Sequence, residues 1–149
     1  VKKLFEIVKP TNAYFGEKDF QQLQIVKKLV SKNNLNVSII GCPIYRETTG
    51  LAMSSRNERL SKENRNEASI IYKTLQIAKE KFGTKSANEV TKWVEKSLKK
   101  NKNITLEYFE IADENTLKTS SRKSKNKKYR AFIAVFIDNI RLIDNISLN

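Results

Sequence analysis

Hydrophobic residues in the first third of the chain follow a strand–helix–strand pattern. The short apolar segment "TNAYF" contains two aromatic residues and favours a strand. After it, apolar residues recur every three or four positions, which is typical of the buried face of a helix. These residues are Phe20, Leu23, Val26 and Val30, with Ile25 and Leu29 beside them. The segment "LNVSIIG" then predicts a second strand, so we expect a βαβ unit with parallel strands and a right-handed crossover.

Local signals mark the ends of the helices in this region. The opening "VKKLFEIVKP" predicts a helix with Leu4, Phe5 and Val8 on one face, ended by Pro10, whose ring cannot continue a helix. No capping residue precedes it, so we expect the sequence to begin inside a domain. Asp19 and Gln22 have the spacing of a capping box at the start of the next helix.

Two further helices are predicted in the middle of the chain. Ser61 has the character of an N-cap for a long helix that runs to about Phe82 and stops at Gly83. Its buried stripe comprises Ala68, Ile71, Tyr72, Leu75, Ala78 and Phe82. Ser86 and Glu89 form a second capping box. The helix that follows carries Val90, Trp93, Val94 and Leu98 on one side.

The last third of the chain has the pattern of β-structure. The segment "ITLEYFEIA" alternates as a half-buried strand does, and "YRAFIAVFIDNIRLIDNISL" predicts two apolar strands folded at Asp138-Asn139. We therefore expect a three-stranded antiparallel sheet after the two helices. The chain as a whole is predicted to be the end of an α/β domain followed by a small α+β domain. They are joined near Ala52 within an irregular loop that starts after Pro43 and has the length of a lid or a linker.

Composition restricts the class of protein. Of the 149 residues, 39% are hydrophobic, and no apolar run approaches the roughly 20 residues that span a membrane. The N-terminal segment lacks the features of a signal peptide. We therefore expect a cytoplasmic protein without membrane contacts. The single cysteine, Cys42, excludes an internal disulfide and is expected to be a small buried residue.

A formal net charge of +13 raises the question of nucleic-acid binding. Positive charge is spread along the chain, with one dense run, Lys118–Arg130, that holds seven basic residues and no acidic one. Such a run is compatible with RNA phosphates and makes an RNA-binding module the alternative function. No aromatic residue interrupts it before Tyr129, so no base-stacking platform accompanies it. A solvated surface loop is therefore the interpretation that we prefer.

The junction between the first strand and its helix has the residue types of an anion site. In open parallel sheets ligands bind at the carboxyl ends of strands, where helix N-termini favour negative charge. Gly16 would let a ligand approach the backbone, Lys18 adds a positive charge, and Asp19 could accept from a ribose hydroxyl. Gln22 lies one turn further and could donate to a carboxylate. A purely structural interpretation, in which Asp19 caps the helix and Lys18 is solvated, remains open.

A second candidate lies in the loop "GLAMSSRN". Ser54, Ser55 and Arg56 place two hydroxyl groups and a bidentate guanidinium after a glycine, which suits a polyphosphate. By itself this segment is a weak signal, because Ser-Ser-Arg in a loop is usually an ordinary surface loop.

Taken together, the motifs resemble one enzyme family. "FGEKDFQQL", "GCPIYRE", "GLAMSSRN" and "RLIDN" occur in the order and spacing seen in pantothenate synthetase, or pantoate–β-alanine ligase. The resemblance covers this whole chain but only about the C-terminal half of a family member. It implies that residues 1–52 are the C-terminal part of a Rossmann-like nucleotidylyltransferase domain that binds ATP and pantoate. Residues 53–149 would be a small α+β lid domain with a three-stranded antiparallel sheet.

The family activity implied is a two-step ligation. ATP activates pantoate as an acyl-adenylate with release of pyrophosphate, and β-alanine then displaces AMP to give pantothenate. ATP is thus expected as a substrate, accompanied by Mg²⁺, for which no metal-binding residue of this chain is assigned. The resemblance also implies a homodimer in the full-length enzyme and no nucleic-acid partner.

The resemblance assigns roles to individual residues. Gly16, Glu17, Lys18 and Asp19 match the ATP-binding run, with Lys18 toward the phosphates and Asp19 toward the ribose. Gln22 matches the glutamine that holds pantoate, and Tyr45 falls where the family contacts adenine through the main chain. The mobile loop corresponds to Met53, Ser54, Ser55 and Arg56. Lys18 and Arg56 would be the catalytic cations that stabilise charge on the phosphates.

One family feature is absent from these residues. Family members carry an HxGH-type motif over the ATP phosphates in their N-terminal half, and this chain contains no histidine. We therefore expect the chain alone to lack ligase activity. We also expect an apolar exposed face on the first part of the chain, with a tendency to associate.

Overall fold

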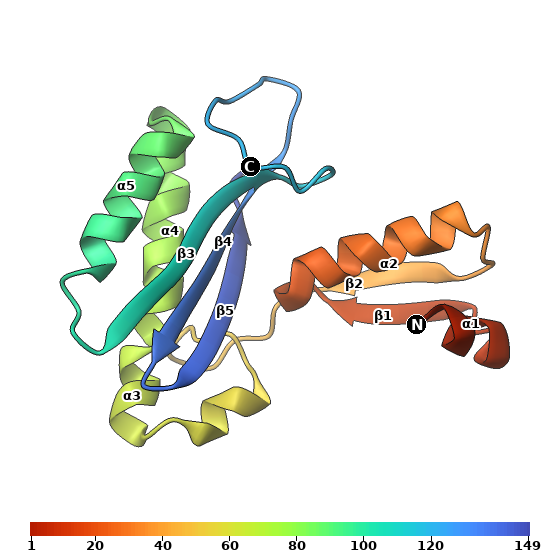
Figure 1. Ribbon diagram of the computed structural model, residues 1–149, viewed down its shortest axis with the longest axis horizontal. Coiled ribbons are helices and arrows are strands. Elements are labelled where there is room, and N and C mark those ends of the chain that lie inside the picture. Colours follow the sequence, from red (N-terminus) through yellow and green to blue (C-terminus); the bar gives the residue numbers. More distant parts are fainter. The chain divides into compact units, whose positions relative to one another are not determined.

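The computed structural model describes all 149 residues, which form two compact units, Val1–Ile44 and Tyr45–Asn149 (Figure 1). The first unit is α/β and the second is α+β, as the sequence predicts. The division between the compact units falls after Ile44, whereas the sequence placed the domain boundary after Ala52.

Side-chain contacts explain why residues 45–52 belong to the second compact unit. Arg46 pairs with Asp144, and Glu47 pairs with Arg65, so the segment after Ile44 is bonded to the second unit. Asp144 lies 98 residues from Arg46 in the chain, and Arg65 lies 18 residues from Glu47.

The first unit contains the predicted βαβ arrangement. Its elements are α1 (Lys2–Val8), β1 (Asn12–Gly16), a 3₁₀ turn η1 (Glu17–Asp19), α2 (Phe20–Lys32) and β2 (Ser38–Cys42). β1 and β2 are parallel, in a register that runs from Asn12 opposite Ser38 to Gly16 opposite Cys42. α2 packs on the strands through its buried residues Phe20, Leu23 and Val26. Both strands therefore end at the same edge, next to the start of α2.

The N-terminal helix differs from its prediction. Only Phe5 of α1 is buried, while Leu4 and Val8 are 60% and 61% exposed. Lys9 ends the helix in the left-handed conformation (φ 47°), directly before Pro10. Other large apolar side chains of this unit are also exposed, namely Val1, Ile7, Tyr14, Ile25 and Ile40. The first unit therefore exposes several large apolar side chains, of which Tyr14 and Ile40 lie opposite each other in the strand register.

The middle of the chain contains three α-helices where two were predicted. Ser61 caps α3 (Lys62–Glu67) by accepting from the backbone N–H of Asn64, but the helix is interrupted at Ala68. α4 (Ser69–Thr84) then carries most of the predicted buried stripe. Gly83 is not the stop residue, because the helix continues through it to Thr84 and ends at Lys85 in an extended conformation.

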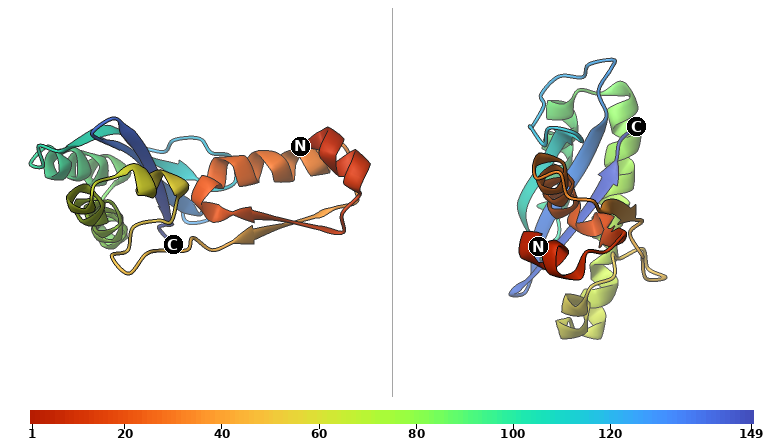
Figure 2. Two further views of the ribbon diagram at one scale, coloured as in Figure 1. Left: turned by 90° about the horizontal axis from the view of Figure 1, so that it is seen from below. Right: turned by 90° about the vertical axis from the view of Figure 1, so that its right-hand side faces the viewer.

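The last helix and the sheet follow the sequence closely. Ser86 and Glu89 form the predicted capping box at the start of α5 (Ala87–Leu98). The strands are β3 (Ile104–Asp113), β4 (Tyr129–Ile137) and β5 (Ile140–Ser147), antiparallel in the order β3-β4-β5. α4 and α5 cover one face of this sheet (Figures 1 and 2). β4 supplies Ala131, Ile133, Val135 and Ile137 to the core between them.

The hairpin between β4 and β5 turns where the sequence predicts. Ile137 pairs with Ile140, and Asp138 between them adopts a positive φ of 51°. Asp and Asn tolerate this left-handed conformation better than most residues, so the Asp138-Asn139 pair sets the register of the two strands.

Candidate functional site

The junction after β1 presents open backbone at the carboxyl end of the two-stranded sheet. A Cβ added to Gly16 would meet no atom within 4 Å, so packing inside the chain does not require glycine there. The absent side chain instead leaves space next to the strand end. Gly41 in β2, which pairs with Phe15, lies beneath Leu23 and Glu17: a Cβ there would lie 3.0 Å from Cδ2 of Leu23 and 3.3 Å from Oε1 of Glu17. The Glu17 side chain therefore covers the end of β2.

Asp19 does not form the predicted capping box. Its side chain makes no capping hydrogen bond, and its backbone (φ −98°, ψ 57°) lies outside the extended region that N-cap residues usually adopt. The physical reason is that Asp19 is the last residue of η1, so the chain already turns before α2 begins. The residue is exposed and its carboxylate does not cap the helix, which removes the structural explanation offered for it.

The other predicted residues of this junction are arranged around it. Lys18 is the middle residue of η1 and is half-buried, while Gln22 is exposed in the first turn of α2. Gly16, Lys18, Asp19 and Gln22 thus share one edge of the first unit, where the backbone N–H groups at the start of α2 favour an anion.

The second group of predicted residues lies in the second unit. Tyr45 and Met53 are 75% and 57% exposed, and Met53 N–H donates to the Tyr45 carbonyl at 2.9 Å. Ser54 precedes a 3₁₀ helix, η2 (Ser55–Arg59), and its Oγ accepts from the backbone N–H of Arg56 at 3.3 Å. The side chains of Ser55 and Arg56 are exposed. The loop predicted from sequence therefore contains a short helix with accessible hydroxyl and guanidinium groups.

A hairpin before this segment is fixed by residues to which the sequence analysis assigned no role. Arg46 and Ala52 form an antiparallel bridge, and Gly50 closes the turn with a positive φ of 90°. The Arg46 guanidinium lies 3.6 Å from the centre of the Tyr72 ring and donates to the Gly50 carbonyl at 3.1 Å. It also forms a bidentate pair with Asp144.

Glu47 and Asn57 form a second buried anchor. Arg65 donates twice to the Glu47 carboxylate at 2.9 Å, and the Asn57 amide donates to it at 2.6 Å. The hydrogen bond from Arg65 is the main reason that the pKa of Glu47 lies below its ordinary value; burial opposes this, and the Asn57 bond adds to it. Glu47 and Asn57 lie at the ends of the quoted motifs "GCPIYRE" and "GLAMSSRN", but the motifs do not show that the two residues bond to each other and to Arg65, because each partner comes from a different element.

The basic run Lys118–Arg130 forms most of the connection between β3 and β4. Arg130 is buried and paired with Glu114 at 2.9 Å, Lys127 approaches Asp113 at 3.9 Å, and Lys123 lies over the Phe82 ring at 4.1 Å. Several of its charges are thus used within the second unit, and Tyr129 is buried rather than available for stacking.

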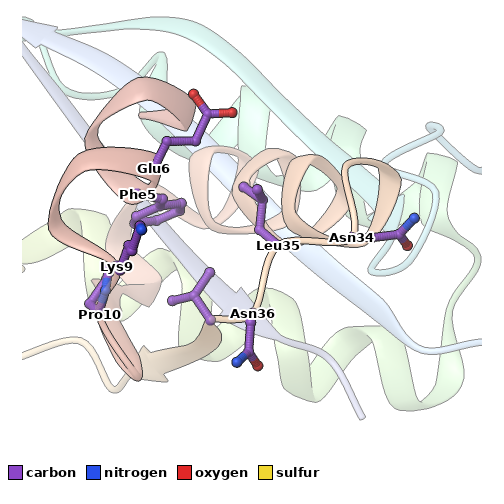
Figure 3. Close-up of a pocket in the computed structure, with 8 residues that line it drawn as sticks. Phe5, Glu6, Lys9, Pro10, Asn34, Leu35 and Asn36 are labelled. Atoms are coloured by element: carbon purple, nitrogen blue, oxygen red, sulfur yellow. The ribbon is translucent and has the colours of Figure 1, made fainter.

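A cavity of about 460 Å³ in the first unit lies away from the junction (Figure 3). Phe5 from α1 and Leu35 from the turn before β2 line it, together with Pro10 and Val37. Pro10 precedes β1 and Val37 precedes β2, so the cavity is at the amino ends of the strands. Ligands of parallel sheets bind at the opposite, carboxyl ends, so this cavity is not the predicted nucleotide site.

Metal-ligating and thiol groups do not form a further site. No group of three or more Cys, Asp or Glu side chains is placed to hold a metal ion. Cys42 is a half-buried free thiol at the end of β2, so it is less buried than expected. None of the helices has the length and apolar character needed to cross a bilayer.

The family model and the curated proteins that match this chain name the same enzyme. The profile of the family described as pantoate-beta-alanine ligase matches residues 1–147. A pantothenate synthetase from Flavobacterium psychrophilum is 68% identical over 99% of this chain, which corresponds to 52% of that protein. The chain thus spans about half the length of the curated relatives it matches.

Solved structures agree with this similarity. A crystal structure of pantothenate synthetase from Thermus thermophilus has a TM-score of 0.89 and 36% identity, covering 99% of this chain and 53% of that one. A pantoate-beta-alanine ligase from Francisella tularensis, crystallised with beta-gamma ATP and beta-alanine, has a TM-score of 0.68 and 33% identity. It covers 99% of this chain and 47% of that one.

Proposed function

The chain belongs to the pantoate–β-alanine ligase family, and on that premise we propose that it forms part of an ATP-dependent ligase that makes pantothenate. In the first step a carboxylate oxygen of pantoate attacks the α-phosphorus of ATP and pyrophosphate leaves. In the second step the amine of β-alanine attacks the acyl carbon, AMP leaves and a proton is released. The ATP analogue and β-alanine in the Francisella tularensis relative support these two substrates.

The observation that carries the proposal is the junction after β1. It combines open backbone at Gly16, an exposed Asp19 carboxylate unused by the helix, and the start of α2. We assign Lys18 to the ATP phosphates, Asp19 to the ribose and Gln22 to the pantoate carboxylate or hydroxyls. Glu17 belongs to the same run and shapes the end of β2.

The segment Met53–Arg56 supplies the second set of contacts in this proposal. Ser54 and Ser55 would donate to phosphate oxygens, and the Arg56 guanidinium would pair with them in bidentate fashion. The main chain at Tyr45 would contact adenine. The exposed side chain of Tyr45 takes no part in that contact, so other residue types would serve at this position. The attacking carboxylate is already ionised, so the protein need not supply a general base. Lys18 and Arg56 act by stabilising charge on the phosphates.

Mg²⁺ enters this proposal as part of the nucleotide substrate. Mg²⁺ at nucleotide sites is usually held by substrate phosphates, waters and one or two carboxylates rather than by an all-protein cage. We further propose that the whole enzyme is a cytoplasmic homodimer with no nucleic-acid substrate.

A pyrophosphate-release assay tests the function. A full-length protein that contains these residues is expected to release pyrophosphate from ATP only when pantoate is present, and to form pantothenate when β-alanine is added. Pyrophosphate release that does not depend on pantoate would contradict the proposed ligase function. The 149-residue chain alone, which contains no histidine, is expected to show no turnover. Sustained turnover by it would show that the N-terminal half of the relatives is dispensable.

An RNA titration at physiological salt tests the alternative function. Because several charges of the Lys118–Arg130 run are paired within the second unit, we expect only weak binding. Tight binding that falls steeply with salt concentration would instead favour an RNA-binding module.

A further inference from the structure

Asn57 closes a loop around the whole segment Met53–Arg56. Its side-chain amide donates to the carbonyl of Ala52 at 3.1 Å, and its backbone N–H donates to the carbonyl of Ser54 at 3.0 Å. The first bond joins the residue before the segment to the residue after it. The second fixes a point inside the segment. A single residue thus restrains all four residues assigned to the nucleotide.

The orientation of Asn57 is fixed by Glu47. The same amide nitrogen that reaches Ala52 also donates to Oε1 of Glu47 at 2.6 Å, and both amide hydrogens are therefore used. Glu47 is in turn held by Arg65 through two hydrogen bonds of 2.9 Å. The amide oxygen of Asn57 is buried and has no hydrogen-bond partner. The donors of this side chain, rather than its acceptor, therefore determine its position.

Asn57 itself is out of reach of a ligand. Its exposed fraction is 1%, whereas Ser55 and Arg56 directly before it are exposed. The residue acts only on the conformation of its neighbours. A loop that is ordered before binding loses less conformational freedom when the ligand binds, so its restraint raises affinity without any added contact.

We propose that Asn57, held by Glu47, is a positioning residue that presents Met53–Arg56 to the polyphosphate of a nucleotide. This inference rests on the proposed function, because it takes ATP as the ligand of that segment. It adds a residue whose contribution comes from hydrogen bonds within the protein and not from contact with substrate.

The test compares two buried asparagines in a full-length protein that contains this chain. Asn57→Leu removes both side-chain donors with little change in volume. Asn145→Leu is the matched control, because Asn145 lies in β5, outside the loop, is 2% exposed and accepts a hydrogen bond from Arg130. Both substitutions are expected to lower the melting temperature. Only Asn57→Leu is expected to raise the KM for MgATP, by at least tenfold, with the KM for β-alanine unchanged.

The same variants are titrated with MgATP by calorimetry, which does not depend on turnover. Wild-type protein that binds MgATP but makes no pantothenate would overturn the ligase assignment and leave the role of Asn57 to be judged from affinity. A folded Asn57→Leu protein with wild-type affinity and KM for MgATP would overturn the positioning role. An equal loss of affinity in Asn145→Leu would also overturn it, since the effect would then follow general destabilisation.

A milder variant covers the case in which Asn57→Leu fails to fold. Asn57→Ser keeps one hydroxyl donor on a shorter side chain, too short to reach both acceptors. We expect a rise of at least threefold in the KM and Kd for MgATP with a smaller loss of thermal stability. Unchanged values in this variant would contradict the proposal.

Discussion

The guanidinium of Arg46 and the carboxylate of Asp144 form a bidentate ion pair, with N–O distances of 2.6 and 3.0 Å, although 98 residues separate them in the chain. Asp144 is almost fully buried in β5, and Arg46 is largely buried against the Tyr72 ring. The pair attaches the hairpin that precedes the Ser54–Arg56 segment to the sheet of the second unit. Its contribution to stability can be tested directly.

Asp144→Ala is expected to lower the free energy of unfolding of the second unit by about 3–5 kcal/mol, because it leaves the Arg46 charge without its carboxylate partner in a poorly hydrated site. Glu107→Ala is the control: it removes the partner of Arg141 in a pair whose side chains are 41% and 37% exposed, and should cost less than about 1 kcal/mol. Urea denaturation of both variants measures the difference. Equal losses of unfolding free energy in the two variants would mean that burial does not increase the contribution of the Arg46–Asp144 pair to stability.

Gly50→Ala is expected to destabilise the hairpin by about 1–3 kcal/mol. Gly50 has a positive φ of 90°, and a Cβ there would lie 2.8 Å from Cδ1 of Tyr72. Gly83→Ala is the matched control, since Gly83 is helical and a Cβ there would meet nothing within 4 Å. That substitution should stabilise the protein by about 0.5–1 kcal/mol. Thermal unfolding of the two variants should therefore shift in opposite directions.

Glu47 should make stability depend on pH in the acid range. Because the hydrogen bond from Arg65 lowers the pKa of Glu47 below 4.5 in the folded protein, the unfolded chain binds the proton more readily. The stabilisation is complete above the unfolded pKa and is lost as pH falls through the folded pKa. The difference in unfolding free energy between wild type and Glu47→Gln should shrink below about pH 4.5. A difference that stays constant between pH 7 and 3 would contradict the pKa shift.

Lys18→Ala in the full-length protein is expected to lower the rate of pantoate-dependent pyrophosphate release at least a hundredfold. Loss of one positioned charge-stabilising contact typically raises a barrier by about 2.7–4 kcal/mol. Lys28→Ala, on the exposed surface of α2, serves as the control and should keep the wild-type rate. A Lys18→Ala protein with most of its activity would refute the role assigned to this lysine.

The sequence determined the order and type of most elements, because their signals are local. The periodicity from Phe20 to Val26 identified α2, the Ser86–Glu89 capping box identified the start of α5, and Asp138 identified the hairpin turn. The four quoted motifs identified the family for the same reason, since they are continuous stretches of chain. The residues assigned to the nucleotide and to pantoate came from those motifs and stay predictions.

Tertiary structure decided the features that depend on distant partners. The sequence predicted one helix from Ser61 to a stop at Gly83. The structure instead has a break at Ala68 and a second helix, α4, that continues through Gly83. Asp19 does not cap α2, because a 3₁₀ turn precedes it. The anchors of the Met53–Arg56 segment pair Arg46 with Asp144 and Glu47 with Arg65 and Asn57. Arg46, Glu47, Asn57 and Asp144 lie in the quoted motifs, but these hydrogen bonds exist only once separate elements have packed, so the motifs do not show which residues pair.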